Sequence, residues 1–158
     1  MIFFSSNRIV IFNVIIIIFL SSFLGFLCHY INVEYFYDYI AQYMEQNNIE
    51  INPYNEKIKY IAFLSSIEYS ISCMLIYVLM RKTLNAFKFS LIKKIIIFSA
   101  LIISIHGNLI RQPIMDYIIG NPLNIVFQQN ILIWLTWIIM SIVIIVGLEF
   151  FILDKKYS

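Results

Sequence analysis

One acidic residue stands inside an otherwise apolar segment, and it raises the first possibility of chemistry in this chain. Glu68 lies about a third to half way along an apolar run over residues 60–80. An acidic side chain at the centre of a membrane helix costs about 2.5–3.5 kcal/mol on insertion scales, so something must offset that cost. His106 falls at a similar depth if a later apolar helix extends to about residue 115.

Two interpretations of Glu68 follow. In the functional one, Glu68 beside a histidine that titrates near neutrality forms a proton or cation site within a bilayer. In the structural one, Glu68 is protonated, or bonded to His106, Asn108 or nearby serines, and fixes the registry of packed helices. The candidate intramembrane polar site comprises Glu68, His106, Asn108 and Arg111.

A second polar cluster occupies the sequence HGNLIRQPIMD, which runs from His106 to Asp116. Its outer members, Gln112 and Asp116, form a candidate outer polar cluster. One interpretation is a vestibule in which Arg111 binds an anion or a small polar ligand. The other is a helix end, where Arg111 snorkels to the headgroups or pairs with Asp116, and Pro113 ends regular backbone bonding. Arg111 can also pair with Glu68 if the helices are staggered.

Seven of the eleven tyrosines gather at or beside residues 31–59. A short amphipathic helix there, with aromatic rings at headgroup depth, is one explanation. A contact surface for another protein is the alternative, since tyrosine is enriched at interface hot spots. The residues of this candidate partner surface are Tyr35, Phe36, Tyr39, Ile40 and Tyr43.

Motifs for metal, nucleotide or covalent chemistry are missing from the sequence. The two cysteines, Cys28 and Cys73, form no CxxC pair, and the two histidines give no HExxH motif. There is no phosphate loop, dinucleotide fingerprint, GxSxG or nucleic-acid motif, and Ser104 beside His106 is not enough for a nucleophile and its base. We therefore expect no cofactor, metal, nucleotide or nucleic acid, and no enzymatic activity.

The composition identifies the kind of molecule that must position these residues. Of the 158 residues, 61% are apolar and 13% charged, against about 45–50% and about 25% in ordinary soluble domains. The mean hydropathy is +0.85. Since about twenty apolar residues make one membrane span, the chain has room for about four spans and no sizeable domain outside the membrane.

The sequence predicts an all-α integral membrane protein, a four-transmembrane-helix bundle forming a single domain over residues 1–158. The first apolar run exceeds the 7–15 residues of a signal-peptide core, so we expect it to stay as an anchor. We expect the serine-bearing second and third spans at the centre of the bundle, and Glu149 near Lys155, Lys156 or headgroup water. The predicted spans are about 9–30, 60–80, 95–115 and 131–153, with an outer loop 31–59 that holds the amphipathic helix and a basic inner loop 81–94.

Positive charge predicts the orientation. Four alternating spans place eight Lys and Arg residues on the side of the termini and three on the other side. Positive residues are retained on the cytoplasmic face, so both termini are expected to be cytoplasmic. The middle loop decides the count, since residues 81–94 hold five positive charges and no acid. The expected location is a bacterial inner (plasma) membrane.

This plan, four spans with both ends inside and very short loops, is similar to that of many small bacterial inner-membrane proteins, including immunity proteins against pore-forming toxins. The resemblance is one of plan, and a shared fold does not give function. Our leading hypothesis is a non-enzymatic accessory or immunity-type factor that contacts another membrane or extracytoplasmic protein, or itself, in the lipid bilayer. The alternative is a small transporter or channel subunit that uses a Glu68/His106 proton or cation site.

Overall fold

The structure is a computed structural model that describes the backbone of residues 3–46 and 57–153, and side chains within 8–34, 42, 45–46 and 59–150. Every regular element in these ranges is a helix. The elements are α1 (Phe3–Gln46), α2 (Lys57–Ala86), α3 (Leu91–Ile105), α4 (Arg111–Ile118), α5 (Leu123–Gly147) and the π-helix η1 (Leu148–Leu153).

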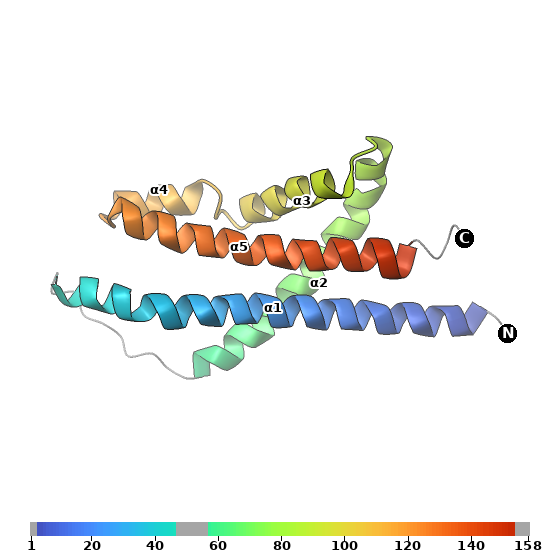
Figure 1. The fold of residues 1–158 in the computed structure, drawn as a ribbon, viewed down its shortest axis with the longest axis horizontal. Helices are drawn as coiled ribbons and strands as arrows, with labels where there is room; N and C mark the ends of the chain where they lie inside the picture. Colours follow the sequence, from blue (N-terminus) through green and yellow to red (C-terminus); the bar gives the residue numbers. More distant parts are fainter. Residues whose placement is uncertain (1–2, 47–56, 154–158) are drawn as a thin grey trace.

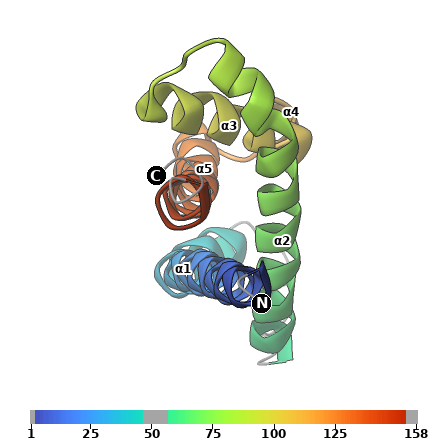
Figure 2. The same ribbon diagram turned by 90° about the vertical axis from the view of Figure 1, so that its right-hand side faces the viewer.

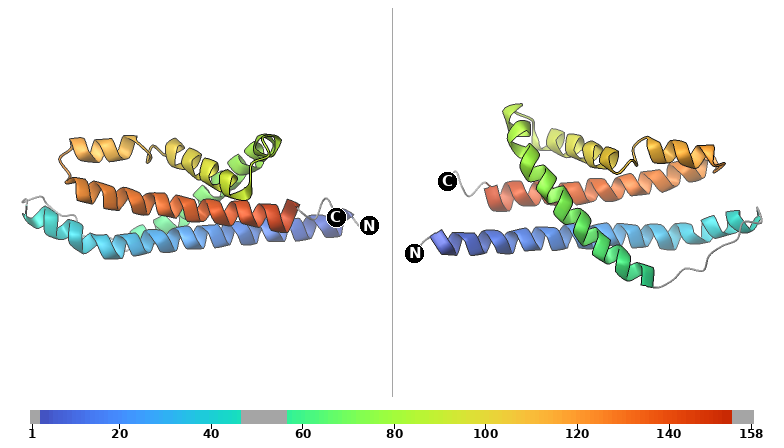
Figure 3. Two further views of the ribbon diagram at one scale, coloured as in Figure 1. Left: turned by 45° about the horizontal axis from the view of Figure 1, so that its top comes forward. Right: turned by 180° about the vertical axis from the view of Figure 1, so that it is seen from behind.

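The helices stack in layers. Helices α1 and α5 run side by side in opposite directions, and α3 and α4 follow each other along the far side of α5 (Figure 1). Figure 2 shows the layers end-on, with α2 lying along one side of the stack. Helix α2 crosses α1 and α5 obliquely, which is clearest from behind (Figure 3). Helix α1 begins and η1 ends at the same end of the molecule (Figure 1).

Three segments of the described chain are long and apolar enough to cross a membrane, namely Arg8–Glu34, Lys59–Ala86 and Leu123–Phe150. This confirms the prediction of a helical membrane protein. The expected third span differs, because its helix α3 has only 15 residues and a hydrocarbon core takes about 20. A fourth crossing by a single unbroken helix is therefore absent from the described residues.

The third segment is divided by a backbone break at Gly107. The φ angle of Gly107 is 72°, a left-handed conformation that glycine adopts without steric penalty. Helix α3 ends just before it, so the helix expected to continue to about residue 115 stops at Ile105. Pro113 does not end regular bonding, as one interpretation held. It is the third residue of α4, within the first turn, where a missing N–H costs no intrahelical bond.

The other helices run past their predicted limits. Helix α1 continues without a break to Gln46, so no separate short helix follows the first span within residues 31–46. Helix α2 reaches Ala86 and α3 starts at Leu91, which shortens the basic loop to a tight turn. The apolar pattern predicted only the apolar parts of these helices. The pattern carries no information on how far a helix continues into polar sequence, because polar residues are equally compatible with a helix.

Helix α5 is the centre of the bundle, since it contacts each of α1, α2, α3 and α4. The expectation that the second and third spans form the centre is wrong, because α2 and α3 share few contacts. Small residues in α1 and α5 let these two helices approach closely. A Cβ atom placed on Gly25 would lie 2.6 Å from Met140 Sδ, and one on Gly147 would lie 2.7 Å from Ile17 Cγ1.

A chain of hydrogen bonds joins three helices in the interior. The Ser70 hydroxyl of α2 donates to Ser21 Oγ of α1 at 3.1 Å. The Ser21 hydroxyl in turn donates to the carbonyl of Met140 in α5 at 3.5 Å. Both serines are completely buried. Buried serine in a membrane bundle is satisfied in this way by a neighbouring helix.

Candidate functional site

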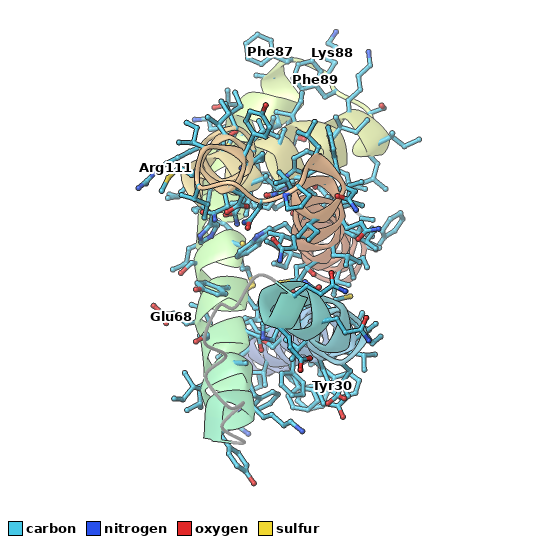
Figure 4. The ribbon with its side chains drawn as sticks, turned by 90° about the vertical axis from the view of Figure 1, so that its left-hand side faces the viewer. Tyr30, Glu68, Phe87, Lys88, Phe89 and Arg111 are labelled. Carbon is cyan, nitrogen blue, oxygen red and sulfur yellow. The ribbon has the colours of Figure 1, made fainter. Side chains whose placement is uncertain are left out.

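Glu68 lies on the outward face of α2. Its side chain is exposed and points away from α1 and α5 (Figure 4). Within the part of the chain that the structure describes, it forms no hydrogen bond or ion pair, whereas the opposite face of α2 is buried through Ser70, Cys73 and Tyr77. The carboxyl that the sequence singled out is thus turned out of the bundle.

His106 lies apart from Glu68, in a group of three aromatic rings. Its imidazole stacks on the indole of Trp137 with ring centroids 4.2 Å apart. The ring of Tyr69 packs edge-on against both, at 5.3 Å from His106 and 5.3 Å from Trp137. These contacts join α2, α5 and the end of α3. No hydrogen bond or ion pair links His106 to Glu68 among the described residues.

Asn108 lies in the break between α3 and α4, and the break is held against α5. The indole N–H of Trp134 donates to the backbone carbonyl of Asn108 at 2.7 Å. The backbone N–H of Asn108 donates to the backbone carbonyl of Ile103 at 3.0 Å. Irregular backbone at membrane depth requires such partners, since lipid offers none.

Arg111 begins α4 and is exposed. It points out of the same side of the molecule as Glu68 (Figure 4). Neither side chain has a partner among the described residues, and they do not pair with each other within the chain. The four residues of the candidate intramembrane polar site therefore do not come together: Glu68 and Arg111 point outward, whereas the exposed His106 packs on Trp137 and the half-buried Asn108 lies in the break held by Trp134.

The outer polar cluster does come together, and it gains a third member. Gln112 Nε2 donates to Asp116 Oδ1 at 2.8 Å, one helical turn along α4. Asn130 Nδ2 of α5 donates to Asp116 Oδ2 at 3.3 Å and to the carbonyl of Val126 at 2.8 Å. Asp116 and Asn130 are both buried. The cluster fastens α4 to α5 and leaves Arg111 outside it.

A charged cluster that the sequence did not predict lies at the end of the bundle where α1 begins and η1 ends (Figure 1). Arg81 of α2 donates to both carboxylate oxygens of Glu149, from Nε and Nη2, at 3.0 Å each. Lys94 of α3 donates to Glu149 Oε1 at 3.2 Å, and the hydroxyl of Tyr77 donates to the same oxygen at 2.7 Å. Glu149 was expected to reach Lys155 or Lys156, which lie outside the described residues.

Two signals in the sequence point to this cluster in retrospect. Tyr77 and Arg81 are four residues apart and so share a face of one helix. Glu149 is the one acid in a long apolar run, and an acid there needs a donor from another helix. What the sequence did not provide was the order of the helices, and hence which basic residue would be the neighbour.

The candidate partner surface cannot be placed. Tyr35, Phe36, Tyr39, Ile40 and Tyr43 fall in helical backbone of α1, but their side chains lie outside the described residues. No group of three or more possible metal ligands occurs among the residues that are described.

Comparison of this chain with protein-family models, with curated proteins and with solved structures finds no match. The function is therefore argued from the geometry alone.

Proposed function

We propose that this protein is a non-enzymatic multi-pass membrane protein that acts through protein–protein contacts within the bilayer, and that the first such contact is with a second copy of itself. In this proposal α3 and α4 together make the third of four crossings, as a broken helix. Both termini are cytoplasmic, and the membrane is a bacterial inner membrane. An accessory or immunity-type role fits a chain that works through surfaces.

The outward direction of Glu68 carries the proposal. A carboxyl facing lipid within a membrane span is costly, and residues of this kind almost always face protein or water instead. Because Glu68 has no partner among the described residues of its own chain, a hydrogen-bond donor from another molecule supports its position.

The surface around Glu68 has the pattern of a helix–helix contact. Six exposed residues follow one another along α2 at spacings of three and four, and we call them the outward stripe. Spacings of three and four keep residues on one face of a helix, as in helices that pack in pairs. The outward stripe consists of Ile61, Leu64, Glu68, Ser72, Leu75 and Leu79.

Charge complementarity favours a second copy as the occupant. Arg111 lies on the same side of the molecule as Glu68 (Figure 4). The two are at neighbouring depths, since Tyr69 contacts His106, five residues before Arg111. Two copies inserted in the same orientation and related by a two-fold axis along the membrane normal bring Glu68 of each to Arg111 of the other. Two ion pairs then form in one contact.

The test measures self-association of the labelled protein in liposomes by single-molecule photobleaching, over a range of protein-to-lipid ratios. We expect dimers in the wild type. In Glu68→Leu, dimers should form only at densities at least about tenfold higher, which corresponds to a loss of about 1.4 kcal/mol. Thermal stability of the monomer should be unchanged or higher, since Glu68 forms no hydrogen bond or ion pair with the described residues of its own chain.

The matched control is Glu34→Gln, which removes an exposed carboxylate that pairs with Lys59 of the same chain at 3.8 Å. It should leave dimerisation unchanged. Arg111→Gln should weaken dimerisation as Glu68→Leu does, and the double variant should weaken it no more than either substitution alone, as coupled partners require. A wild type that stays monomeric at every density would overturn the proposal, as would additive effects of the two substitutions.

The transporter alternative gains no specific support from the geometry. His106 stacks on Trp137 and meets Tyr69 edge-on, while Glu68 points away from α1 and α5 (Figure 4). A Glu68/His106 proton or cation site stays a prediction of the sequence.

A further inference from the structure

A cavity of about 400 Å³ opens between α1, α2 and α5 in the half of the bundle away from Glu149. Its floor is made of the buried residues Gly25, Ser66, Trp137 and Met140. Its rim includes the exposed residues His29 and Ile61, at the ends of their spans. The size is within the range of about 300–1,000 Å³ that is typical of small-molecule sites.

The cavity is lined by polar side chains that form no hydrogen bond with any described residue. Asn108 brings the backbone break to the cavity wall, and its side-chain amide is among these groups. In hydrocarbon each such group without a partner is costly, so a molecule with matching polar groups stabilises the site. The six residues are His29, Asn32, Ser65, Tyr69, Asn108 and Trp137.

Among the described residues, the lining holds no Asp, Glu, Lys or Arg. A charged ligand would lose its hydration without meeting an opposite charge, which is unfavourable at membrane depth. The rings of Phe26, Tyr69 and Trp137 supply flat apolar walls, and the stack of His106 on Trp137 fixes one of them in place. The site suits a molecule with an apolar body and uncharged oxygen-bearing groups.

We propose that this cavity binds an uncharged amphiphile carrying hydroxyl or carbonyl groups, which enters from the leaflet next to His29 and Ile61. The polar groups of the ligand bond to the six side chains, and its apolar part lies against Phe26, Trp137 and Met140. The proposal is independent of self-association, because the cavity lies on the buried side of α2 and the outward stripe contributes only Ile61, at the rim.

The probe is dioctanoylglycerol, which has one hydroxyl and two ester carbonyls and no charge. The thermal unfolding of the whole protein in phosphatidylcholine nanodiscs is measured with increasing dioctanoylglycerol, and separately with dioctanoyl phosphatidic acid, which has the same chains and a charged phosphate. Ligands that bind only the folded state raise the midpoint by mass action. We expect a saturable rise of about 5–10 °C with dioctanoylglycerol at about a hundred times its Kd, and none with phosphatidic acid.

Three variants tie the rise to the cavity. Ser65→Leu fills the space from a half-buried position and should abolish the rise while leaving the midpoint without ligand unchanged or higher. Asn32→Leu removes one polar group near the rim and should lower the apparent affinity at least about fivefold, which is about 1 kcal/mol. If Ser65→Leu does not fold, Asn32→Leu still tests whether the ligand binds in the cavity. The matched control Ser104→Leu makes the same change as Ser65→Leu at an exposed serine outside the cavity and should keep the full rise.

Each other outcome overturns the proposal. An equal rise with phosphatidic acid would show a bilayer effect or a site that accepts charge. A rise that persists in both Ser65→Leu and Asn32→Leu would place the binding elsewhere. No rise at any concentration would mean that the cavity holds only water.

Discussion

Glu149 holds together the end of the bundle where α1 begins and η1 ends. One carboxylate accepts hydrogen bonds from α2 and α3 while belonging to η1, so three elements meet at a single side chain. Arg81 and Lys94 bring two positive charges against one negative charge, and the side chains of Lys94 and Glu149 are only 10% and 14% exposed. Removing Glu149 would take away the carboxylate that both cations share in a largely buried site.

Replacing Glu149 by Gln should therefore lower the free energy of unfolding by about 3 kcal/mol or more. Lys94→Met should lower it by less than half as much, because the Arg81–Glu149 pair that remains is neutral and bidentate. Unfolding of the purified protein by sodium dodecyl sulfate measures both values. Equal losses in the two variants would contradict this account of the charge balance.

At the level of single residues, spacing along one helix was predictable and pairing between helices was not. Gln112 and Asp116 are four apart, and they bond as their position on one helical face predicts. Glu68 and His106 were matched by depth alone. Depth does not tell which way a side chain faces, and Glu68 faces outward. The interior positions of Ser21 and Asn130 depend on the packing of α1 and α4 against α5.

Among the described elements, the contact of α1 with α5 is the most extensive in the bundle. It depends on two glycines that meet different kinds of side chain. At Gly25 the neighbour is Met140, an unbranched side chain with several rotatable bonds. At Gly147 the neighbour is Ile17, whose branched side chain has one strongly preferred rotamer in a helix. An added Cβ atom would crowd its neighbour to nearly the same extent at both glycines, but we expect the two alanine substitutions to lower the stability by different amounts.

Gly147→Ala is expected to destabilise the protein by about 1–3 kcal/mol through overpacking, and Gly25→Ala by clearly less. The gain in helix propensity is the same for both substitutions and cancels in the comparison. Adding Ile17→Ala to Gly147→Ala should recover part of the loss. The midpoint of thermal unfolding ranks the variants, and the reverse order would show that Met140 is the more rigid neighbour.

The three long helices were predictable because each carries a long, mainly apolar run, whereas α3 and α4 were not. The predicted third span, about 95–115, is mainly apolar, and its composition alone indicates one helix that continues through His106 and Gly107. The break depends on the left-handed Gly107 and on the carbonyl of the next residue, Asn108, which accepts from the indole N–H of Trp134. Such a partner is known only once α5 is seen beside the break. The sequence also offered Pro113 as the place for the break, and helix N-termini accept proline readily.

At the scale of the whole molecule, the broken third segment decides the topology. If α3 and α4 cross together, the turn between α2 and α3 and the turn between α4 and α5 lie on opposite sides of the membrane. If they do not cross, both turns lie on the same side and the two termini lie on opposite sides.

Single cysteines at Lys88 and Asn121, in a chain without Cys28 and Cys73, distinguish the two cases. A membrane-impermeant maleimide applied to intact spheroplasts should label Asn121→Cys, and should label Lys88→Cys only after permeabilisation. This follows from the positive charge around Lys88, which is retained in the cytoplasm. Labelling of both cysteines from the same side would leave three crossings.

The central place of α5 also has a consequence for biosynthesis. The ribosome delivers α5 and η1 after α1 to α4, so these four helices are made before the elements that hold them together. Until η1 follows, Arg81 and Lys94 have no Glu149, and until α5 follows, the Ser21 hydroxyl has no Met140 carbonyl to bond. We therefore expect the insertion machinery to keep these polar groups away from lipid until α5 and η1 follow.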